Sequence, residues 1–260
     1  MNVFILTDLE GIGGVTDIDF MDRATEKYAL ARTLLSKSID LAVKTAFESG
    51  ADNVYYLDGH GGGGNAIEDM IDSRAQKCSI AEWQALLREG RIDCQIELGS
   101  HARAGTIGGF LDHTLTSKEW FCHKVNGREM SELSMHAILC ASYGVPVVAC
   151  IGDETACAQA KEYIPEIFTG ALKKADCRNR CVTYENCDSI LVNTVKTALE
   201  NYKSVPIYKE KEPLTVELTY YRTDMCERAL ARSGNEVRRI DARTLQKTVE
   251  KMTKYEDLKF

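Results

Sequence analysis

Short apolar runs alternate with longer amphipathic segments along this 260-residue chain, and that alternation restricts the folds it can adopt. Short runs rich in β-branched and aromatic residues are typical of buried strands, whereas apolar residues at three- and four-residue spacing indicate helices. We expect strands at 2–7, 53–57, 95–99, 120–125, 147–151 and 214–220. We expect helices at 21–49, 80–87, 130–143, 153–160, 189–201, 224–231 and 242–252. Strands that alternate with helices pair in parallel through βαβ units, so the sequence predicts an α/β fold.

The pattern loosens after Pro165, and this is where we expect a boundary. Residues 1–165 are expected to form an α/β domain with a mostly parallel sheet and flanking helices. Residues 166–260 are expected to form a smaller C-terminal α+β region. An ordinary insertion within a single domain is the alternative.

Charge and hydropathy exclude several classes of partner. The chain has 32 Lys and Arg against 39 Asp and Glu, a net charge of −7, so we expect neither nucleic acid nor an anionic membrane surface as a partner. No run approaches the ~18 apolar residues of a membrane helix. The apolar run Val3–Leu6 is too short for a secretory signal and lacks a basic start. We therefore expect a cytoplasmic protein whose thiols stay reduced.

Three of the ten cysteines, Cys177, Cys181 and Cys187, stand close together in the sequence. A zinc ribbon usually requires CxxC pairs and four ligands, and this cluster has neither. We therefore do not expect a structural zinc there, and the sequence leaves the role of the cluster open.

Polar side chains follow the predicted strands, at the ends where open α/β sheets bind their ligands. They are Asp8 and Glu10 after the first strand, Asp58 and His60 after the second, Ser100, His101 and Arg103 after the third, Glu132 at the start of a helix, and Asp153 after the strand at 147–151. The ordinary interpretation is that the carboxylates cap turns or face solvent and that each histidine is a hydrogen-bonded structural residue.

Five of these residues together indicate a metal site. Asp8 and Glu10 stand two apart, so in an extended segment their side chains point the same way and need a cation between them. Imidazole and carboxylate ligands without cysteine suit catalytic zinc, or manganese and cobalt. Five ligands are too many for one tetrahedral ion, but they would fit two ions about 3.5–4 Å apart with a bridging carboxylate and a bridging water. The five residues are Asp8, Glu10, His60, His101 and Glu132.

Other histidines and motifs give weaker signals. His123 falls within a predicted strand and His136 within a predicted helix, and we interpret both as structural. The segment Gly59–Gly64 matches the dinucleotide-binding pattern GxGxxG, but a glycine run matches it trivially and no strong helix follows. The sequence contains neither a phosphate-binding GxxxxGK[ST] loop nor a GxSxG nucleophile elbow.

Taken together, the motifs resemble those of the zinc-dependent D-aminopeptidases of the DppA type, peptidase family M55. The resemblance is specific over about residues 1–165 and thin beyond them. It rests on Thr7-Asp-Leu-Glu-Gly-Ile-Gly-Gly14, Asp58-Gly-His60, Leu98-Gly-Ser-His-Ala-Arg-Ala104, Asp112-His113 and Asn126-Gly-Arg-Glu-Met-Ser-Glu-Leu133, in that order and spacing.

The resemblance implies a role for each site residue. By this resemblance, Asp8 is expected to bridge two zinc ions. Glu10 and His60 are expected to complete the ligands of one ion, and His101 and Glu132 those of the other. His113 resembles the family's non-ligand catalytic histidine, a role that comes from the resemblance alone. The family also implies a cytoplasmic homodecamer of two stacked pentamers that admits short peptides to an interior chamber.

The expected function is therefore metal-dependent removal of an N-terminal D-amino acid, of the D-Ala type, from short peptides. The sequence departs from the family where a small hydroxyl residue commonly precedes the second-strand histidine. Gly59 stands at that position and Gly61–Gly64 follow the histidine, which leaves substrate and stereospecificity open. The alternatives are another dinuclear-metal hydrolase acting on other amides or on phosphate esters, and a dinucleotide-binding oxidoreductase.

Overall fold

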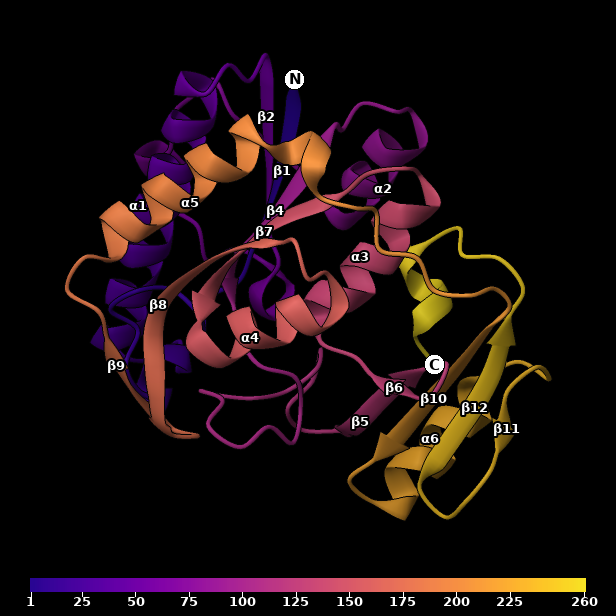
Figure 1. The fold of residues 1–260 in the computed structure, drawn as a ribbon. Coiled ribbons are helices and arrows are strands. Elements are labelled where there is room, and N and C mark those ends of the chain that lie inside the picture. Colours follow the sequence, from indigo (N-terminus) through magenta and orange to yellow (C-terminus); the bar gives the residue numbers. More distant parts are fainter.

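A seven-stranded sheet forms the centre of the computed structural model, which describes residues 1–260 (Figure 1). Its order is β3-β2-β1-β4-β7-β8-β9, and neighbouring strands are parallel except for the β8–β9 pair. Its strands are β1 (Asn2–Thr7), β2 (Asn53–Asp58), β3 (Gln76–Lys77), β4 (Cys94–Ser100), β7 (Val147–Asp153), β8 (Phe168–Cys177) and β9 (Arg180–Thr183). The predicted α/β class with a mostly parallel sheet is confirmed.

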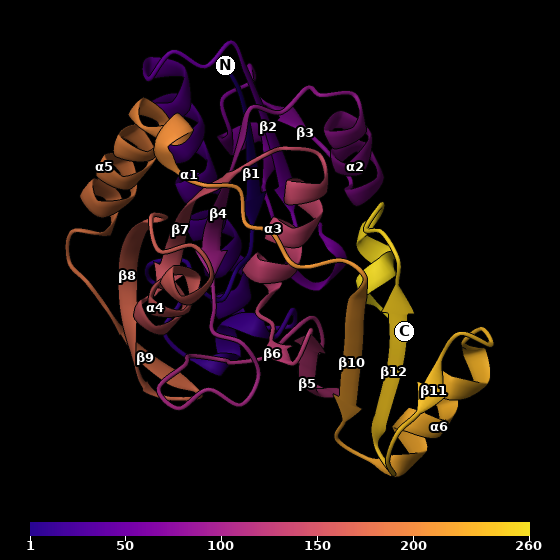
Figure 2. The ribbon, with the colours of Figure 1, turned by 45° about the vertical axis from the view of Figure 1, so that its right-hand side comes forward.

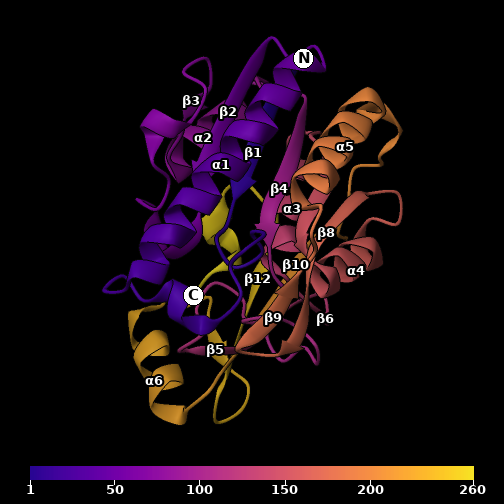
Figure 3. The same ribbon diagram turned by 90° about the vertical axis from the view of Figure 1, so that its left-hand side faces the viewer.

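Helices cover both faces of this sheet. The helices α1 and α5 pack against each other over one face, and α2, α3 and α4 lie on the opposite face (Figure 3). Their bounds are α1 (Glu26–Glu48), α2 (Ile80–Arg88), α3 (Glu132–Ser142), α4 (Glu154–Tyr163) and α5 (Cys187–Glu200). The helix expected from residue 21 begins five residues later because Thr25 caps it, accepting a hydrogen bond from the Tyr28 backbone N–H.

A second, smaller sheet lies to one side of the first, at the lower right of Figure 1 and again beside α3 in Figure 2. It is antiparallel, with the order β11-β12-β10-β5-β6, and α6 packs against β10 and β12. Its elements are β5 (Trp120–Val125), β6 (Arg128–Glu129), β10 (Leu214–Tyr220), α6 (Thr223–Arg232), β11 (Arg238–Arg239) and β12 (Thr244–Val249). The chain ends in a 3-10 turn, η5 (Tyr255–Leu258).

The two sheets do not divide at residue 165. Strands β8 and β9, which follow that residue, extend the larger sheet, and β5 and β6, which precede it, belong to the smaller one. A boundary between residues 165 and 166 would therefore cut the seven-stranded sheet.

The helix expected at 242–252 is wrong, because this segment contains strand β12. Its backbone pairs antiparallel with β10, with Leu245 opposite Leu218, and both leucines are buried. Residues with weak helical preference, including Thr244, Thr248 and Val249, favour the strand once a partner edge is available. Strands β8 and β9 had no counterpart among the predicted elements.

The core lies between the larger sheet and its helices. Strands β4 and β7 are buried along their whole length, as expected for parallel strands covered on both faces. None of the helices combines the length and apolar character needed to cross a membrane.

Candidate metal centre

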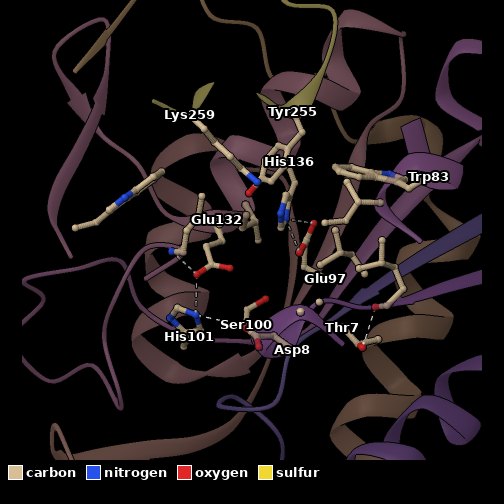
Figure 4. Close-up of a pocket in the computed structure, with 18 residues that line it drawn as sticks. Thr7, Asp8, Trp83, Glu97, Ser100, His101, Glu132, His136, Tyr255 and Lys259 are labelled. Atoms are coloured by element: carbon tan, nitrogen blue, oxygen red, sulfur yellow. Dashed lines mark hydrogen bonds and ion pairs between the residues drawn. The ribbon is translucent and has the colours of Figure 1, made fainter. Parts of the chain in front are cut away.

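The residues expected to form the site gather at the carboxyl edge of the larger sheet. Asp8 follows β1, His60 opens a 3-10 turn after β2, and His101 follows β4, while Glu132 is the first residue of α3. Figure 4 shows Asp8, His101 and Glu132 facing one another. The donor atoms form two groups, each within 4.8 Å: Asp8, Glu10 and His60 in one, and His101, His113 and Glu132 in the other.

Asp8 joins the two groups through its two carboxylate oxygens. Its Oδ1 lies 3.2 Å from His60 Nδ1, and its Oδ2 lies 3.1 Å from His101 Nε2. Glu10 Oε2 is 2.9 Å from the same His60 nitrogen, and Glu132 Oε1 is 3.3 Å from His101 Nε2. A carboxylate with one oxygen toward each group has the arrangement that a ligand shared by two ions requires.

His101 is prepared to act as a ligand. Its Nδ1 lies 3.0 Å from the Ala102 carbonyl oxygen, which can only accept, so Nδ1 carries the proton. Its Nε2 is buried and makes no hydrogen bond, although it faces two carboxylates. A buried lone pair directed at carboxylate oxygens is unfavourable unless a cation lies between them. The donor set therefore fits a divalent metal.

His113 lies between the two groups. Its ring stacks on His101 with centroids 4.1 Å apart, and its Nδ1 donates to the Leu111 carbonyl over 2.8 Å. Its Nε2 therefore faces the site, 3.8 Å from Glu132 Oε1 and 4.0 Å from Glu10 Oε1. Both distances exceed those of His101 to its carboxylates, so His113 stands farther from the acidic oxygens than the other ring.

The loop that carries His113 is held in a restricted conformation. Leu111 and Leu115 adopt positive φ values of 48° and 59°, which L-residues rarely do. The Leu111 carbonyl fixes His113, and the Leu115 backbone N–H donates to Glu132 Oε1 over 2.8 Å. Residues held in such conformations cluster at functional sites.

The carboxylates of the cluster need positive charge nearby to balance them. Burial alone would lower the pKa of His60, but the charge of Glu10 and hydrogen bonds with Asp8 and Glu10 raise it to about 11. Burial likewise opposes ionisation of Glu132, yet the charge of His101 brings its pKa down to about 2. Without metal, protons on the imidazoles balance the carboxylates; a divalent cation would replace them and release protons.

Close backbone packing brings the strand ends together. Gly99 has φ of +82°, and a Cβ there would lie 2.0 Å from the Asp8 carbonyl oxygen. Gly11 is similarly tight, because its Cβ would lie 2.2 Å from the Ser100 carbonyl oxygen. Only glycine at these two positions lets the ends of β1 and β4 approach each other so closely.

Two buried charged residues support the site from behind. Lys173 on β8 is fully buried, and its Nζ donates to the carbonyl oxygens of Glu10, over 2.7 Å, and of Val15. Asp153 caps α4 and accepts a hydrogen bond from the Phe110 backbone N–H over 2.7 Å, which holds the start of the His113 loop. Sequence reasoning missed Lys173, although a lysine within an apolar strand is itself a signal.

Two other strand-end residues lie apart from the metal centre. Asp58 accepts hydrogen bonds from the backbone N–H groups of Asn65 and Ala66 and so folds the loop after His60. Arg103 pairs with Glu162 at 3.0 Å, so this arginine is not directed at the cluster.

The glycine loop is not a dinucleotide site. Gly61–Gly64 all have positive φ, and the loop contains only a three-residue 3-10 turn. A pyrophosphate site of this type requires the N-terminus of a helix that directly follows the glycines.

Two hollows meet at the cluster. One, of about 560 Å³, opens between the glycine loop and the His113 loop. The other, of about 310 Å³, runs from Asp8 and Glu132 to Trp83, His136, Tyr255 and Lys259 (Figure 4). His136, interpreted as structural, lies 3.1 Å from Glu97 Oε1 through its Nδ1 and lines this second hollow. Sequence reasoning found no part for Tyr255 or Lys259.

Comparisons with known proteins identify the family to which the chain belongs. A D-aminopeptidase of Bacillus subtilis (strain 168) is 28% identical over 228 residues, which cover 85% of this chain and 82% of that protein. The fold is similar to that of the "Zn-dependent D-aminopeptidase DppA from Bacillus subtilis, a self-compartmentalizing protease", with a TM-score of 0.90 and 22% identity, covering 99% of this chain and 95% of that one. The family model of D-aminopeptidases, peptidase M55, matches residues 1–258. The match extends over nearly the whole chain, and this protein therefore belongs to the peptidase M55 family of D-aminopeptidases.

Proposed function

We propose that this protein removes an N-terminal D-amino acid, of the D-Ala type, from short peptides with the help of two zinc ions. Asp8 would bridge the ions, with Glu10 and His60 on one and His101 and Glu132 on the other. The observation that carries this proposal is the position of Asp8, whose two oxygens face His60 and His101 separately. The Zn-dependent relative of the same fold supports the choice of metal.

The chain's own residues would bind and orient the substrate. The free α-amino group would bind beside the metal ions that Asp8, Glu10 and Glu132 hold. The scissile carbonyl then lies where the two hollows meet. Zinc, when bound, polarises a carbonyl and lowers the pKa of a bridging water towards about 7.

His113 would move the proton. Its Nδ1 proton is held by the Leu111 carbonyl, so Nε2 is the atom that takes a proton from the attacking water. The same Nε2–H then donates to the amine that leaves. Stacking on His101 and the fixed Leu111 contact keep the ring oriented between these steps.

The first test is hydrolysis of paired L- and D-alanyl dipeptides by zinc-loaded protein, with and without chelator. We expect cleavage of the D-series only, abolished by chelator and restored by zinc. Chelator-sensitive cleavage of the L-series alone would overturn the stereochemistry. Cleavage of neither series would favour a different amide substrate, admitted by the altered glycine loop.

The proposed assembly is a cytoplasmic homodecamer of two stacked pentamers with the sites facing an interior chamber. The relative described as self-compartmentalizing supports an assembly of this kind. Light scattering on the purified protein tests it, and a mass near ten times the 29.0 kDa chain is the expected result.

A further inference from the structure

The hollow of about 310 Å³ beside the metal centre has a polar end that the proposed reaction does not use. Its walls carry apolar side chains, including Leu57, Trp83 and Leu133, and its far end is closed by Tyr255 and Lys259. Figure 4 shows the tips of Tyr255 and Lys259 together at the edge opposite Asp8. A mostly apolar pocket with a few convergent polar groups is the usual form of a specificity site.

The Tyr255 hydroxyl has no hydrogen-bond partner although the residue is only 3% exposed. Leaving such a group unpaired is unfavourable, so buried hydroxyls normally have a partner. Burial raises the pKa of Tyr255 well above its ordinary value, so the hydroxyl keeps its proton and is available as a donor. The ammonium of Lys259 lies 4.3 Å from the centre of the same ring.

The remaining charges of the pocket are already compensated. Glu97 accepts a hydrogen bond from Gln95 Nε2 over 2.7 Å and pairs with His136. Burial alone would lower the pKa of His136, but the charge of Glu97 raises it. Lys259 is thus the cation at this end without a carboxylate in contact. Burial lowers its pKa, and a bound anion would stabilise its charged form.

The chain fixes this end of the pocket in place. His123 Nε2 donates to the Leu258 carbonyl over 2.7 Å, and the Tyr255 backbone N–H donates to Gln84 Oε1 over 3.1 Å. Lys247 Nζ donates to the Lys259 carbonyl. These contacts come from β5, α2 and β12, so three separate elements hold the terminal turn against the site.

We propose that Lys259 and Tyr255 bind a carboxylate of the substrate, so that the preferred substrates are short D-peptides with a carboxylate in this pocket. An ammonium and a phenolic hydroxyl side by side donate to the two oxygens of one carboxylate. The α-amino group would lie beside the metal ions, and Lys259 repels it from the far end of the pocket, which fixes the direction of the peptide. This inference rests on the proposed function.

The carboxylate has two chemical sources, and the test distinguishes them. It is the α-carboxylate of a dipeptide, or the side-chain carboxylate of an acidic N-terminal residue. For the α-carboxylate, cleavage of D-Ala-D-Ala is compared with cleavage of D-Ala-D-Ala amide. For the side-chain carboxylate, cleavage of D-Glu-D-Ala amide is compared with cleavage of D-Gln-D-Ala amide. A charge-assisted hydrogen bond predicts that kcat/KM is about 10- to 100-fold higher for the acid in one of the pairs.

The variants are Lys259→Met and Tyr255→Phe, with Lys259→Arg as the conservative substitution and Lys251→Met as the matched control at an exposed lysine. We expect Lys259→Met to bring the acid-to-amide ratio close to one, through a rise in KM for the acid. Lys259→Arg should restore most of the ratio, and Lys251→Met should leave it intact. Tyr255→Phe should reduce it by a smaller factor.

An unchanged ratio in Lys259→Met overturns the carboxylate assignment while the D-peptidase function stands. If wild-type protein cleaves no D-peptide, the proposed function fails instead. Calorimetric binding of D-Ala-D-Ala and its amide to wild type and Lys259→Met then tests the pocket alone. Tighter binding of the acid by wild type only would support the assignment, and equal binding would overturn it.

Discussion

The metal centre and the far end of the substrate pocket are built in different ways. The metal centre comes from short motifs at the ends of β1, β2 and β4 and the start of α3, each fixed within a few residues of a regular element. The far end comes from the C-terminal turn, held by hydrogen bonds with Gln84, His123 and Lys247.

The difference shows which properties each part controls. Parallel strands fix the relative positions of their ends, so ligands there are held with little freedom, as metal coordination requires. The terminal turn is held by a few hydrogen bonds and by the burial of Tyr255 and Leu258, and it forms no part of either sheet. We infer that the sheet edge sets the reaction and that the terminal turn sets the substrate.

Replacing Asp8 is the strongest way to break the metal centre alone. Because one oxygen faces each donor group, Asp8→Ala should remove both ions and abolish activity. Zinc per chain, measured by mass spectrometry, should fall to background while circular dichroism shows an intact fold. Glu10→Ala is the matched variant, since it should empty mainly the site shared with His60. Full zinc content in Asp8→Ala would show that Asp8 is not a shared ligand.

Substitution of His113 distinguishes a role in catalysis from a role in metal binding. Proton transfer by a positioned side chain typically contributes about 100- to 10,000-fold in rate, so His113→Ala should lose a factor in that range in kcat and keep its zinc. Lys251→Met, at an exposed lysine outside both donor groups, is the control. A loss of one zinc per chain from His113→Ala would instead make His113 a ligand in the group with His101 and Glu132.

Substitution of Lys173 tests whether the backbone behind the cluster contributes to zinc binding. Lys173→Met keeps the length of the buried side chain but leaves the carbonyl oxygens of Glu10 and Val15 without their donor. Removing such support for a ligand typically costs about 10- to 100-fold in metal affinity or activity. Zinc titration with a competing chelator should show weaker zinc binding by Lys173→Met. Lys173→Arg should not restore the zinc affinity, because the planar guanidinium does not fit the site of a compact ammonium. Wild-type zinc affinity in Lys173→Met would limit Lys173 to stability.

The sequence predicted that the candidate ligands lie together, because most of them directly follow strand ends. Asp8, Glu10, His60 and His101 follow three strands that the apolar pattern identifies, and the structure brings them together with Glu132. The resemblance alone pointed to His113, since no spacing separates it from His123. Which ions these residues hold stays a prediction.

The rest of the site depends on contacts between distant residues. Tyr255 and Gln84 are 171 positions apart, and Lys173 and Glu10 are 163 apart. The segment around β12 carries a helical pattern and becomes a strand only because β10 offers an edge. Tertiary pairing of this kind overrides local preference and leaves no local signature.

The last expected effect is on stability rather than on activity, and it concerns the terminal turn in acid. Burial lowers the pKa of His123 to about 4, against about 6.5 for an unfolded histidine. Between these pH values the unfolded chain binds the extra proton, so the folded protein loses stability as pH falls from about 6.5 to 4, by about 3 kcal/mol in all. His123→Gln keeps an amide donor for the Leu258 carbonyl and has no titrating group. The free energy of unfolding in urea is measured for chelator-treated wild-type protein and for chelator-treated His123→Gln. As the pH falls through this range, wild-type protein should lose stability relative to the variant. If the difference between the two unfolding free energies does not change with pH, protonation of His123 is not what weakens the attachment of the terminal turn in acid.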